Sequence, residues 1–172
     1  NILTVRIPFG LRTNTEWCYL LGDFSVRLAG AAAVLYPPEA RIGFSSLTHQ
    51  GMPFYGGNIL YHTEIETPEC IAQIQASYYR GAHIKLLVDG KETGNLTFSP
   101  YSADIPLTAG KHRIEFLLYG SRINTFGGMH NLTQLGWPGP PFWRSTGSSW
   151  CYEYVLKDFG ILASPVIKIF EK

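Results

Sequence analysis

The sequence predicts an all-β protein, folded as an antiparallel β-sandwich or barrel. Three features lead to this expectation. Short runs of β-branched, aromatic and other apolar residues recur at intervals of roughly 8–12 residues. Glycine and proline, which account for 18 and 11 of the 172 residues, punctuate these runs where turns are expected. Helical periodicity is nearly absent, and no repeat or low-complexity linker divides the chain, so we expect a single domain.

The first third of the chain holds four short apolar runs, each bounded by glycine, proline or asparagine. We expect strands over residues 3–7, 17–21, 24–28 and 32–36. Residues 1–50 are then N-terminal strands that lead into the main sandwich at about residues 57–172.

Residues 59–66 show the clearest alternation in the chain. Four side chains share one face of a half-buried strand, and four others share the opposite face. The first face carries Ile59, Tyr61, Thr63 and Ile65, and the second carries Leu60, His62, Glu64 and Glu66. Pro68 ends this strand, and β-friendly residues resume over 71–78.

An Asp-Gly pair gives the strongest signal for a hairpin. Asp89-Gly90 separates a short apolar run at 84–88 from a second strand-like run at 91–97. This dipeptide is typical of a two-residue type I′ turn, in which both central residues have positive φ. We therefore expect a tight turn at this position rather than a long loop.

The remaining strands are expected over residues 102–107, with an interruption at Pro106, and over 111–119. After Gly120 the pattern is irregular, and glycine and proline clusters at 127–128 and 136–141 predict long loops. Runs at 152–156 and 166–170 predict the last two strands.

Composition excludes several classes of function. Charged residues make up 16% of the chain and aromatic residues 14%, while 14 basic and 13 acidic residues leave a net charge of +1. This balance gives no electrostatic footprint for nucleic acid and no basic patch for a membrane surface. A surface that is poor in charge and rich in aromatic residues suits an uncharged ligand or a neighbouring protein surface.

The three cysteines, Cys18, Cys70 and Cys151, lie too far apart for a zinc site or a disulfide framework. We expect buried free thiols, and one disulfide with a remaining thiol is the alternative. No run reaches the ~18 apolar residues of a membrane span, and the first residues alternate like a strand rather than a signal peptide. We expect a piece of a longer polypeptide, whose compartment stays open.

No catalytic motif is present among those that can be recognised from spacing. The five histidines show no metal-ligand spacing, and Glu64 with Glu66 reads as a solvated pair on one strand face. A glycosidase requires two opposed carboxyl groups, and the acidic residues are few. We expect that this chain is not itself an enzyme.

Two loop regions carry more aromatic and polar residues than turn geometry requires. They cover residues 50–58 and 122–131, the second being extended by residues 137–144. Neutral sugars are bound by aromatic rings that stack on their C–H faces and by polar side chains that fix their hydroxyl groups. The candidate ligand-binding residues are Tyr55, Asn58, Arg122, Asn124, His130, Trp137 and Trp143.

A structural alternative exists for the same residues. Phe54, Phe126 and Trp137 could serve as core plugs beneath long loops. In that interpretation, Asn58 and Asn124 form turns, and Arg122 pairs with a nearby carboxylate.

Several motifs resemble a known family of domains. Residues 57–131 contain, in order, a strand with Tyr61 near its start, the hairpin IKLLVDGK at 84–91, PYSADI at 100–105 and LTAGKHRIEF at 107–116. This order resembles the sugar-binding, jelly-roll domain, of galactose-binding-like type, found in family 2 and related bacterial glycoside hydrolases. The blocks NTEWCYLLGDF at 14–24 and WRSTG at 143–147 are similar to the terminal regions of large, uncharacterised glycoside hydrolases that carry such a domain at their C-terminal end.

The resemblance implies a jelly-roll sandwich that acts as a non-catalytic, carbohydrate-binding accessory module, with neutral glycan and the catalytic domain of the same polypeptide as partners. The alternative is a structural module that braces the catalytic domain without binding sugar. The first 50 residues precede the recognisable jelly roll and depart from the family pattern. Such sandwiches often hold a structural calcium ion, but no set of oxygen ligands can be assembled from the sparse carboxylates here. We therefore assign no cofactor and leave a structural calcium ion open.

Overall fold

The computed structural model describes residues 2, 4–11, 19–133 and 145–171 of the chain, and it confirms an all-β fold with antiparallel sheets. A four-stranded sheet has the order β3 (Ile59–Thr67), β9 (Gly110–Leu118), β6 (Ile84–Val88) and β7 (Lys91–Leu96). A three-stranded sheet has the order β11 (Val166–Glu171), β4 (Cys70–Gln75) and β8 (Ser102–Leu107). These two sheets form the layers of a sandwich.

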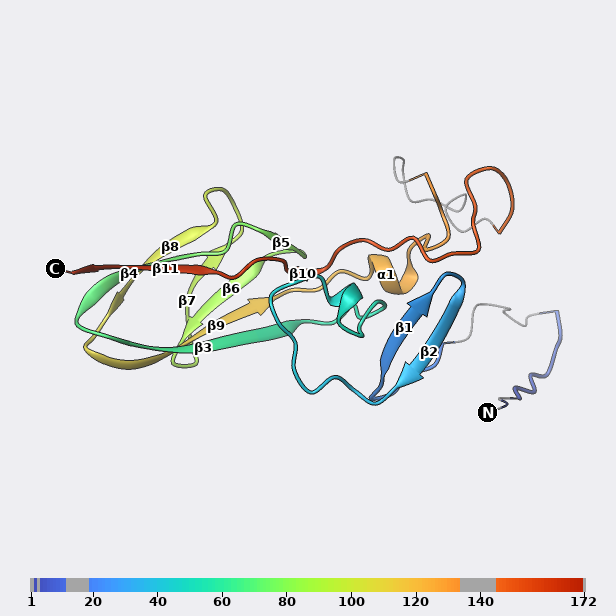
Figure 1. Ribbon diagram of the computed structural model, residues 1–172, viewed down its shortest axis with the longest axis horizontal. Helices are drawn as coiled ribbons and strands as arrows, with labels where there is room; N and C mark the ends of the chain where they lie inside the picture. The colour runs from blue at the N-terminus through green and yellow to red at the C-terminus, as the bar shows by residue number, and fades with distance from the viewer. Residues whose placement is uncertain (1, 3, 12–18, 134–144, 172) are drawn as a thin grey trace.

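The other elements are short and lie mostly toward one end of this sandwich (Figure 1). The hairpin of β1 (Ser25–Ala29) and β2 (Ala32–Tyr36) forms a separate two-stranded sheet, and β5 (Tyr79–Arg80) pairs with β10 (Gly160–Ile161). Among the described residues, the helices are a 3-10 turn, η1 (Leu47–His49), and the four-residue α1 (Ile123–Phe126). No helix in the described ranges is long and apolar enough to cross a membrane.

The sandwich core follows from the alternation in the sequence. In β3, Ile59 and Tyr61 point inward, whereas Leu60 and His62 point outward. Phe116 of β9 is the register partner of Tyr61 of β3, so both side chains lie on the inner face of the sheet. The inner faces of the two large sheets share one apolar cluster, in which Cys70 is a buried free thiol.

The Asp89-Gly90 hairpin is confirmed. Asp89 has φ 51° and Gly90 has φ 76°, as a type I′ turn requires, and β6 and β7 flank them directly. Pro106 does not interrupt its strand. It lies in β8, an edge strand of the three-stranded sheet, where a residue without an N–H is tolerated, and it pairs with Ile71 of β4.

Three strand predictions are wrong within the described residues. Residues 4–7 and 19–21 have no regular structure, although apolar alternation predicted strands there. Residues 152–156 also form no strand. Val155 N–H donates to the Met129 carbonyl at 2.6 Å and Cys151 N–H to the His130 carbonyl at 2.9 Å, so this run lies against a loop rather than a ladder.

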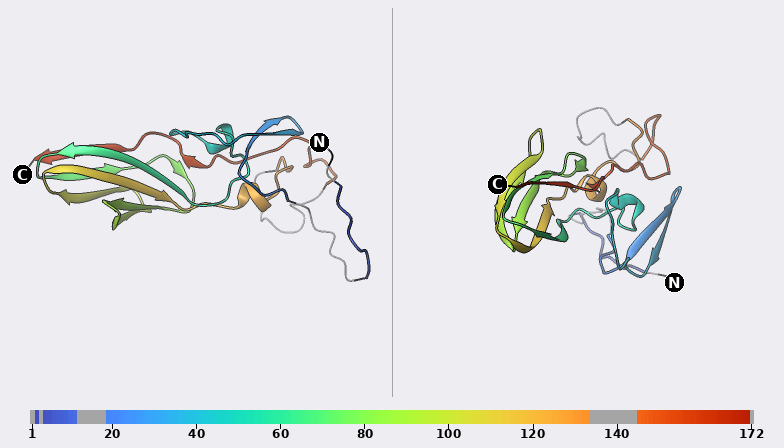
Figure 2. Two further views of the ribbon diagram at one scale, coloured as in Figure 1. Left: turned by 90° about the horizontal axis from the view of Figure 1, so that it is seen from below. Right: turned by 60° about the vertical axis from the view of Figure 1, so that its left-hand side comes forward.

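The two ends of the molecule differ in what they contain. The hairpin β1–β2 lies at the end away from the C-terminus, with η1 and α1 between it and the sandwich (Figure 1). The turned views in Figure 2 show the same separation, with the long strands of the sandwich on one side and the shorter elements on the other. We call the part of the molecule with β1–β2, η1, α1 and the connections around them the loop end.

Candidate ligand-binding site at the loop end

The two loops singled out by their composition are packed against each other. Residues 50–58 lead into β3, and residues 119–131 follow its neighbour β9, so the sheet order places both at the loop end. The Thr125 hydroxyl donates to the Phe54 carbonyl at 2.8 Å. The Gly120 N–H donates to Asn58 Oδ1 at 3.1 Å. These hydrogen bonds join the loops to each other.

Three glycines are needed here for close approach rather than for turning. A Cβ on Gly120 would collide with the carbonyl oxygens of Gly56 and Gly57, and a Cβ on Gly56 would lie 2.7 Å from Thr125 Oγ1. A Cβ on Gly57 would run into the ring and hydroxyl of Tyr55. None of the three has a positive φ, so the space between the loops accounts for them.

Tyr55 is held in one orientation while much of its ring remains open. Its hydroxyl donates to the Asn58 carbonyl at 3.0 Å, and its ring packs beside Gly57. The side chain is nevertheless 40% exposed. A partly exposed ring whose hydroxyl is already engaged presents an ordered apolar face to any ligand.

Tyr55 lines a cleft of about 520 Å³ between its own loop and the segment that leads into β1. The lining comes from three stretches of chain that are distant in sequence. They are residues 20–26, residues 38–39 and residues 51–55. The volume falls within the range of small-molecule sites, roughly 300–1,000 Å³.

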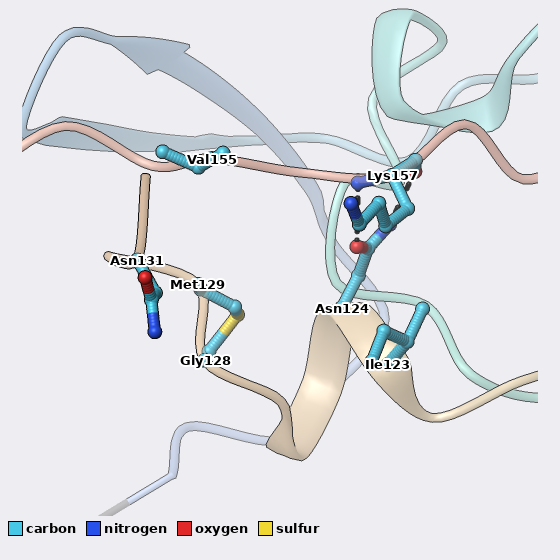
Figure 3. A pocket seen from close by; sticks show the side chains of 7 residues that line it. All are labelled: Ile123, Asn124, Gly128, Met129, Asn131, Val155 and Lys157. Atoms are coloured by element: carbon cyan, nitrogen blue, oxygen red, sulfur yellow. Dashed lines mark hydrogen bonds between the residues drawn. The ribbon is translucent and has the colours of Figure 1, made fainter. Parts of the chain in front are cut away.

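Asn124 plays a different part from the one that the composition indicated. Its side chain is only 3% exposed, and its amide clamps the backbone of Lys157 (Figure 3). Nδ2 donates to the Lys157 carbonyl at 2.7 Å, and Oδ1 accepts from the Lys157 N–H at 2.9 Å. The cavity beside it, lined also by Met129 and Val155, measures about 20 Å³, which is room for about one water molecule.

The other polar candidates are mainly engaged with the chain itself. His130 Nδ1 donates to the Glu153 carbonyl at 3.0 Å, and its ring lies 4.7 Å from that of Tyr154. The Arg122 guanidinium lies 6.0 Å from the centre of the Phe126 ring and forms no ion pair with a carboxylate in the described residues. Arg122 is an exposed residue.

The aromatic candidates divide into three groups. Phe54 is partly buried with its ring edge-on to Tyr154 at 5.1 Å, which agrees with a plug beneath the loops. Phe126 remains exposed and meets Tyr19 edge-on at 5.2 Å. Trp137 and Trp143 lie outside the described residues.

Several residues of the cleft were missed by sequence reasoning. Leu21, Asp23, Phe24 and Glu39 line it beside Tyr55. No local pattern could have found them, because the cleft exists only where the hairpin β1–β2 docks on the loop. The Val26 N–H donates to the Gly51 carbonyl at 2.8 Å and forms that junction.

The described part of the chain contains no group of three His, Cys, Asp or Glu side chains that could hold a metal ion. Cys151 is a partly buried free thiol that donates to the Glu153 carbonyl at 3.3 Å.

The lining of the Tyr55 cleft offers an aromatic face, apolar side chains and two carboxylates.

No protein-family model and no curated protein matches the sequence. Among solved structures, the chain is similar to part of a rhamnosidase from Novosphingobium sp. PP1Y, with a TM-score of 0.51 and 13% identity over 94% of this chain and 16% of that one. A family GH2 β-galacturonidase from Eisenbergiella tayi, bound to galacturonate, aligns over 55% of this chain and 17% of its own, with 19% identity and a TM-score of 0.36. Both neighbours are glycoside hydrolases. The chain spans about one sixth of the rhamnosidase, and this likeness shows a common fold.

Proposed function

We propose that this chain is a non-catalytic accessory module of a bacterial glycoside hydrolase and that it binds neutral glycan in the cleft beside Tyr55. The observation that carries the proposal is the Tyr55 ring, which is fixed by its hydrogen bond yet 40% exposed at a cleft of about 520 Å³. The shared fold with a segment of a rhamnosidase supports the class of enzyme to which the module belongs.

The proposed binding mode is stacking on one preorganised ring. A sugar offers a C–H face that suits an aromatic ring, and little ordering is needed on the protein side because the Tyr55 hydroxyl is already bonded to Asn58. Asn58, Asn124 and His130 then act by holding the loops through backbone hydrogen bonds. Arg122, Trp137 and Trp143 stay in the proposal as further contacts for hydroxyl groups and sugar rings.

The test is a titration of the Tyr55→Ala variant against a panel of neutral oligosaccharides, beside the parent chain. Stacking of a base on an aromatic platform contributes roughly 1–3 kcal/mol, so by analogy we expect affinity to fall by about 5- to 150-fold. Tyr78→Ala is the matched control, because Tyr78 is also an exposed tyrosine but lies outside the cleft lining. Equal binding by Tyr55→Ala and the parent would refute the site, and a parent that binds no member of the panel would refute glycan binding.

A second candidate function is a brace against a neighbouring domain, and a specific observation favours it. Large apolar side chains are exposed along the N-terminal segment and the hairpin β1–β2. They are Ile2, Val5, Ile7, Phe9, Leu11, Tyr19, Leu20, Leu21, Val34 and Leu35. Residues 28–38 also contain no charged side chain. Large exposed apolar patches are typical of protein interfaces, and this number of exposed apolar side chains favours an interface here.

The bracing role predicts an association that does not depend on sugar. A Val34→Ser, Leu35→Ser double variant should weaken binding of this chain to the separately expressed remainder of its parent enzyme. Phe98→Ser is the control, since Phe98 is exposed on the sandwich, away from the hairpin. Bracing is contradicted if the double variant associates as tightly as the parent chain does.

A further inference from the structure

The charged side chains that line the Tyr55 cleft are all acidic. The lining contains two acidic residues, Asp23 and Glu39, and no basic residue, although the whole chain carries a net charge of +1. Neither carboxylate forms an ion pair with a side chain in the described ranges. Both residues are exposed, so their charge faces the solvent in and around the cleft.

The two carboxylates are brought to the cleft by the ends of the hairpin β1–β2. Asp23 lies two residues before β1, and Glu39 lies three residues after β2. The Glu39 N–H donates to Ser25 Oγ at 3.0 Å, which holds the chain leaving β2 beside the start of β1. The hairpin therefore brings both acidic residues into the lining of one cleft, which the Tyr55 loop also lines.

Hydrogen bonding within the protein fixes the hairpin segments that line the cleft, residues 20–26 and 38–39, against the Tyr55 loop, residues 51–55. The Val26 N–H bonds the Gly51 carbonyl at 2.8 Å, and Ser25 and Val26 are buried at that junction. Pro53, two residues before Tyr55 in the same loop, is fully buried. A cleft with fixed walls can discriminate among ligands by charge without first closing around them.

We propose that Asp23 and Glu39 make this cleft selective for neutral sugars over the corresponding uronic acids. This inference rests on the proposed function and adds its specificity. Ionised carboxylates accept hydrogen bonds from sugar hydroxyl groups but offer no donor to a sugar carboxylate. They also repel an anion directly, so a C6 carboxylate on the ligand is disfavoured where a C6 hydroxyl is accepted.

The test compares two matched pairs of probes, galactose with galacturonic acid and glucose with glucuronic acid. Each pair differs only at C6. Repulsion between two exposed charges about 4 Å apart is on the order of 1 kcal/mol in water, so we expect the neutral member to bind at least about fivefold more tightly at low ionic strength. Because the charges are exposed, the preference should shrink as salt is raised.

An Asp23→Asn, Glu39→Gln double variant should bind the neutral sugar and the uronic acid of each pair with similar affinity. Its control is Glu64→Gln, Glu66→Gln, which makes the same change in net charge on the outer face of β3, away from the cleft. The control should keep the preference, since a loss caused by overall charge alone would appear in both variants.

The outcomes separate this inference from the function on which it rests. If the neutral sugars bind through Tyr55 and the uronic acids bind equally well, or if the cleft double variant keeps the full preference, the selectivity is refuted and the glycan site stands. If no sugar of either pair and no member of the neutral oligosaccharide panel binds, the proposed function fails and the selectivity with it.

Discussion

The strands of the sandwich and of the hairpin β1–β2 have similar apolar sequence patterns, but their apolar side chains are buried to very different extents. In the sandwich, alternate residues of β3, β6 and β9 enter a shared core, where Phe116 is 2% exposed. In the hairpin, Val34 and Leu35 on opposite faces of β2 are 57% and 48% exposed. A two-stranded hairpin has little stability of its own in water. The comparison teaches that the sandwich supplies stability, while the loop end supplies surface for recognition.

The junction between these regions relies on hydrogen bonds in which a backbone group is at least one of the two partners. The hairpin is attached through the bond from Val26 N–H to the Gly51 carbonyl, and the loops behind it are joined through Gly120 and Thr125. Such contacts order the loop end without covering its apolar side chains. Side chains that remain open after folding, as Tyr55 does, are then available to a ligand or a partner.

The largest expected effect comes from truncating the sandwich core. Phe116→Ala should lower the free energy of unfolding by about 3–5 kcal/mol, because it removes a buried ring between the two sheets. Leu35→Ala in the hairpin should change it by less than about 0.5 kcal/mol, because that side chain is largely exposed already. Urea unfolding of both variants measures the contrast. Similar losses in the two would show that the hairpin has a buried face in the isolated chain.

A smaller effect is expected at the clamp between α1 and the C-terminal segment. Asn124→Ala should cost about 1–3 kcal/mol, because it removes the two part-buried hydrogen bonds between the Asn124 amide and the backbone of Lys157. Asn95→Ala, at an exposed asparagine of β7, is the control and should be close to neutral. Thermal unfolding measures both. A stable Asn124→Ala variant that had lost sugar binding would instead assign Asn124 to the ligand.

The smallest effect is a pH dependence at the opposite end of the sandwich from the cleft. His112 Nδ1 lies 2.8 Å from Asp89 Oδ2, and Nε2 lies 2.9 Å from the Thr108 carbonyl, so both ring nitrogens face acceptors. The bond to Asp89, followed by that to Thr108, raises the pKa of His112 above its ordinary value of 6.5. The bonds from His112 and from the Arg113 N–H lower the pKa of Asp89 below 3.8.

The sign of the dependence follows from these two directions. The stabilisation from His112 is fully present below pH 6.5 and is lost as the pH rises through its raised folded pKa. The stabilisation from Asp89 is present above pH 3.8 and is lost as the pH falls through its lowered folded pKa. The contribution of the pair is therefore greatest between these two values.

Asp89→Asn tests this pair, because asparagine tolerates the positive φ of the turn and can still accept from the Arg113 N–H. The variant should be more destabilised relative to the parent at pH 5.5 than at pH 8.5, as measured by thermal unfolding. An NMR titration should show the pKa of His112 falling in the variant. An unchanged His112 pKa would contradict the role assigned to Asp89.

The fold could be predicted well wherever local pattern and burial agree. The alternation of β3, the Asp89-Gly90 turn and the bounds of β2, β6 and β8 all follow from period-two patterning and turn chemistry. The failures lie where a strand-like run had no partner strand. Residues 152–156 are an example, since their backbone groups bond to the loop around Met129 instead. Pairing depends on distant segments, which a local pattern does not reveal.

The candidate site was predictable only in part, for a related reason. The composition of residues 50–58 pointed to Tyr55, whose exposed ring lines the cleft. It could not show that Asn124 would be buried against Lys157, because that contact joins residues 33 positions apart. Nor could composition show that steric contact between the two loops requires the glycines at 56, 57 and 120. The presence of Asp23 and Glu39 in the cleft lining could not be predicted either, because it depends on how the hairpin packs against the Tyr55 loop.

The central claim is that a neutral glycan occupies the cleft at the loop end. Backbone NMR of the parent chain during titration with the neutral oligosaccharide panel tests it most directly. We predict concentration-dependent shifts confined to residues 20–26, 38–39 and 51–58, with the strands of the sandwich unchanged. Shifts centred on the outer faces of the two large sheets, or no shift with any oligosaccharide, would contradict the claim.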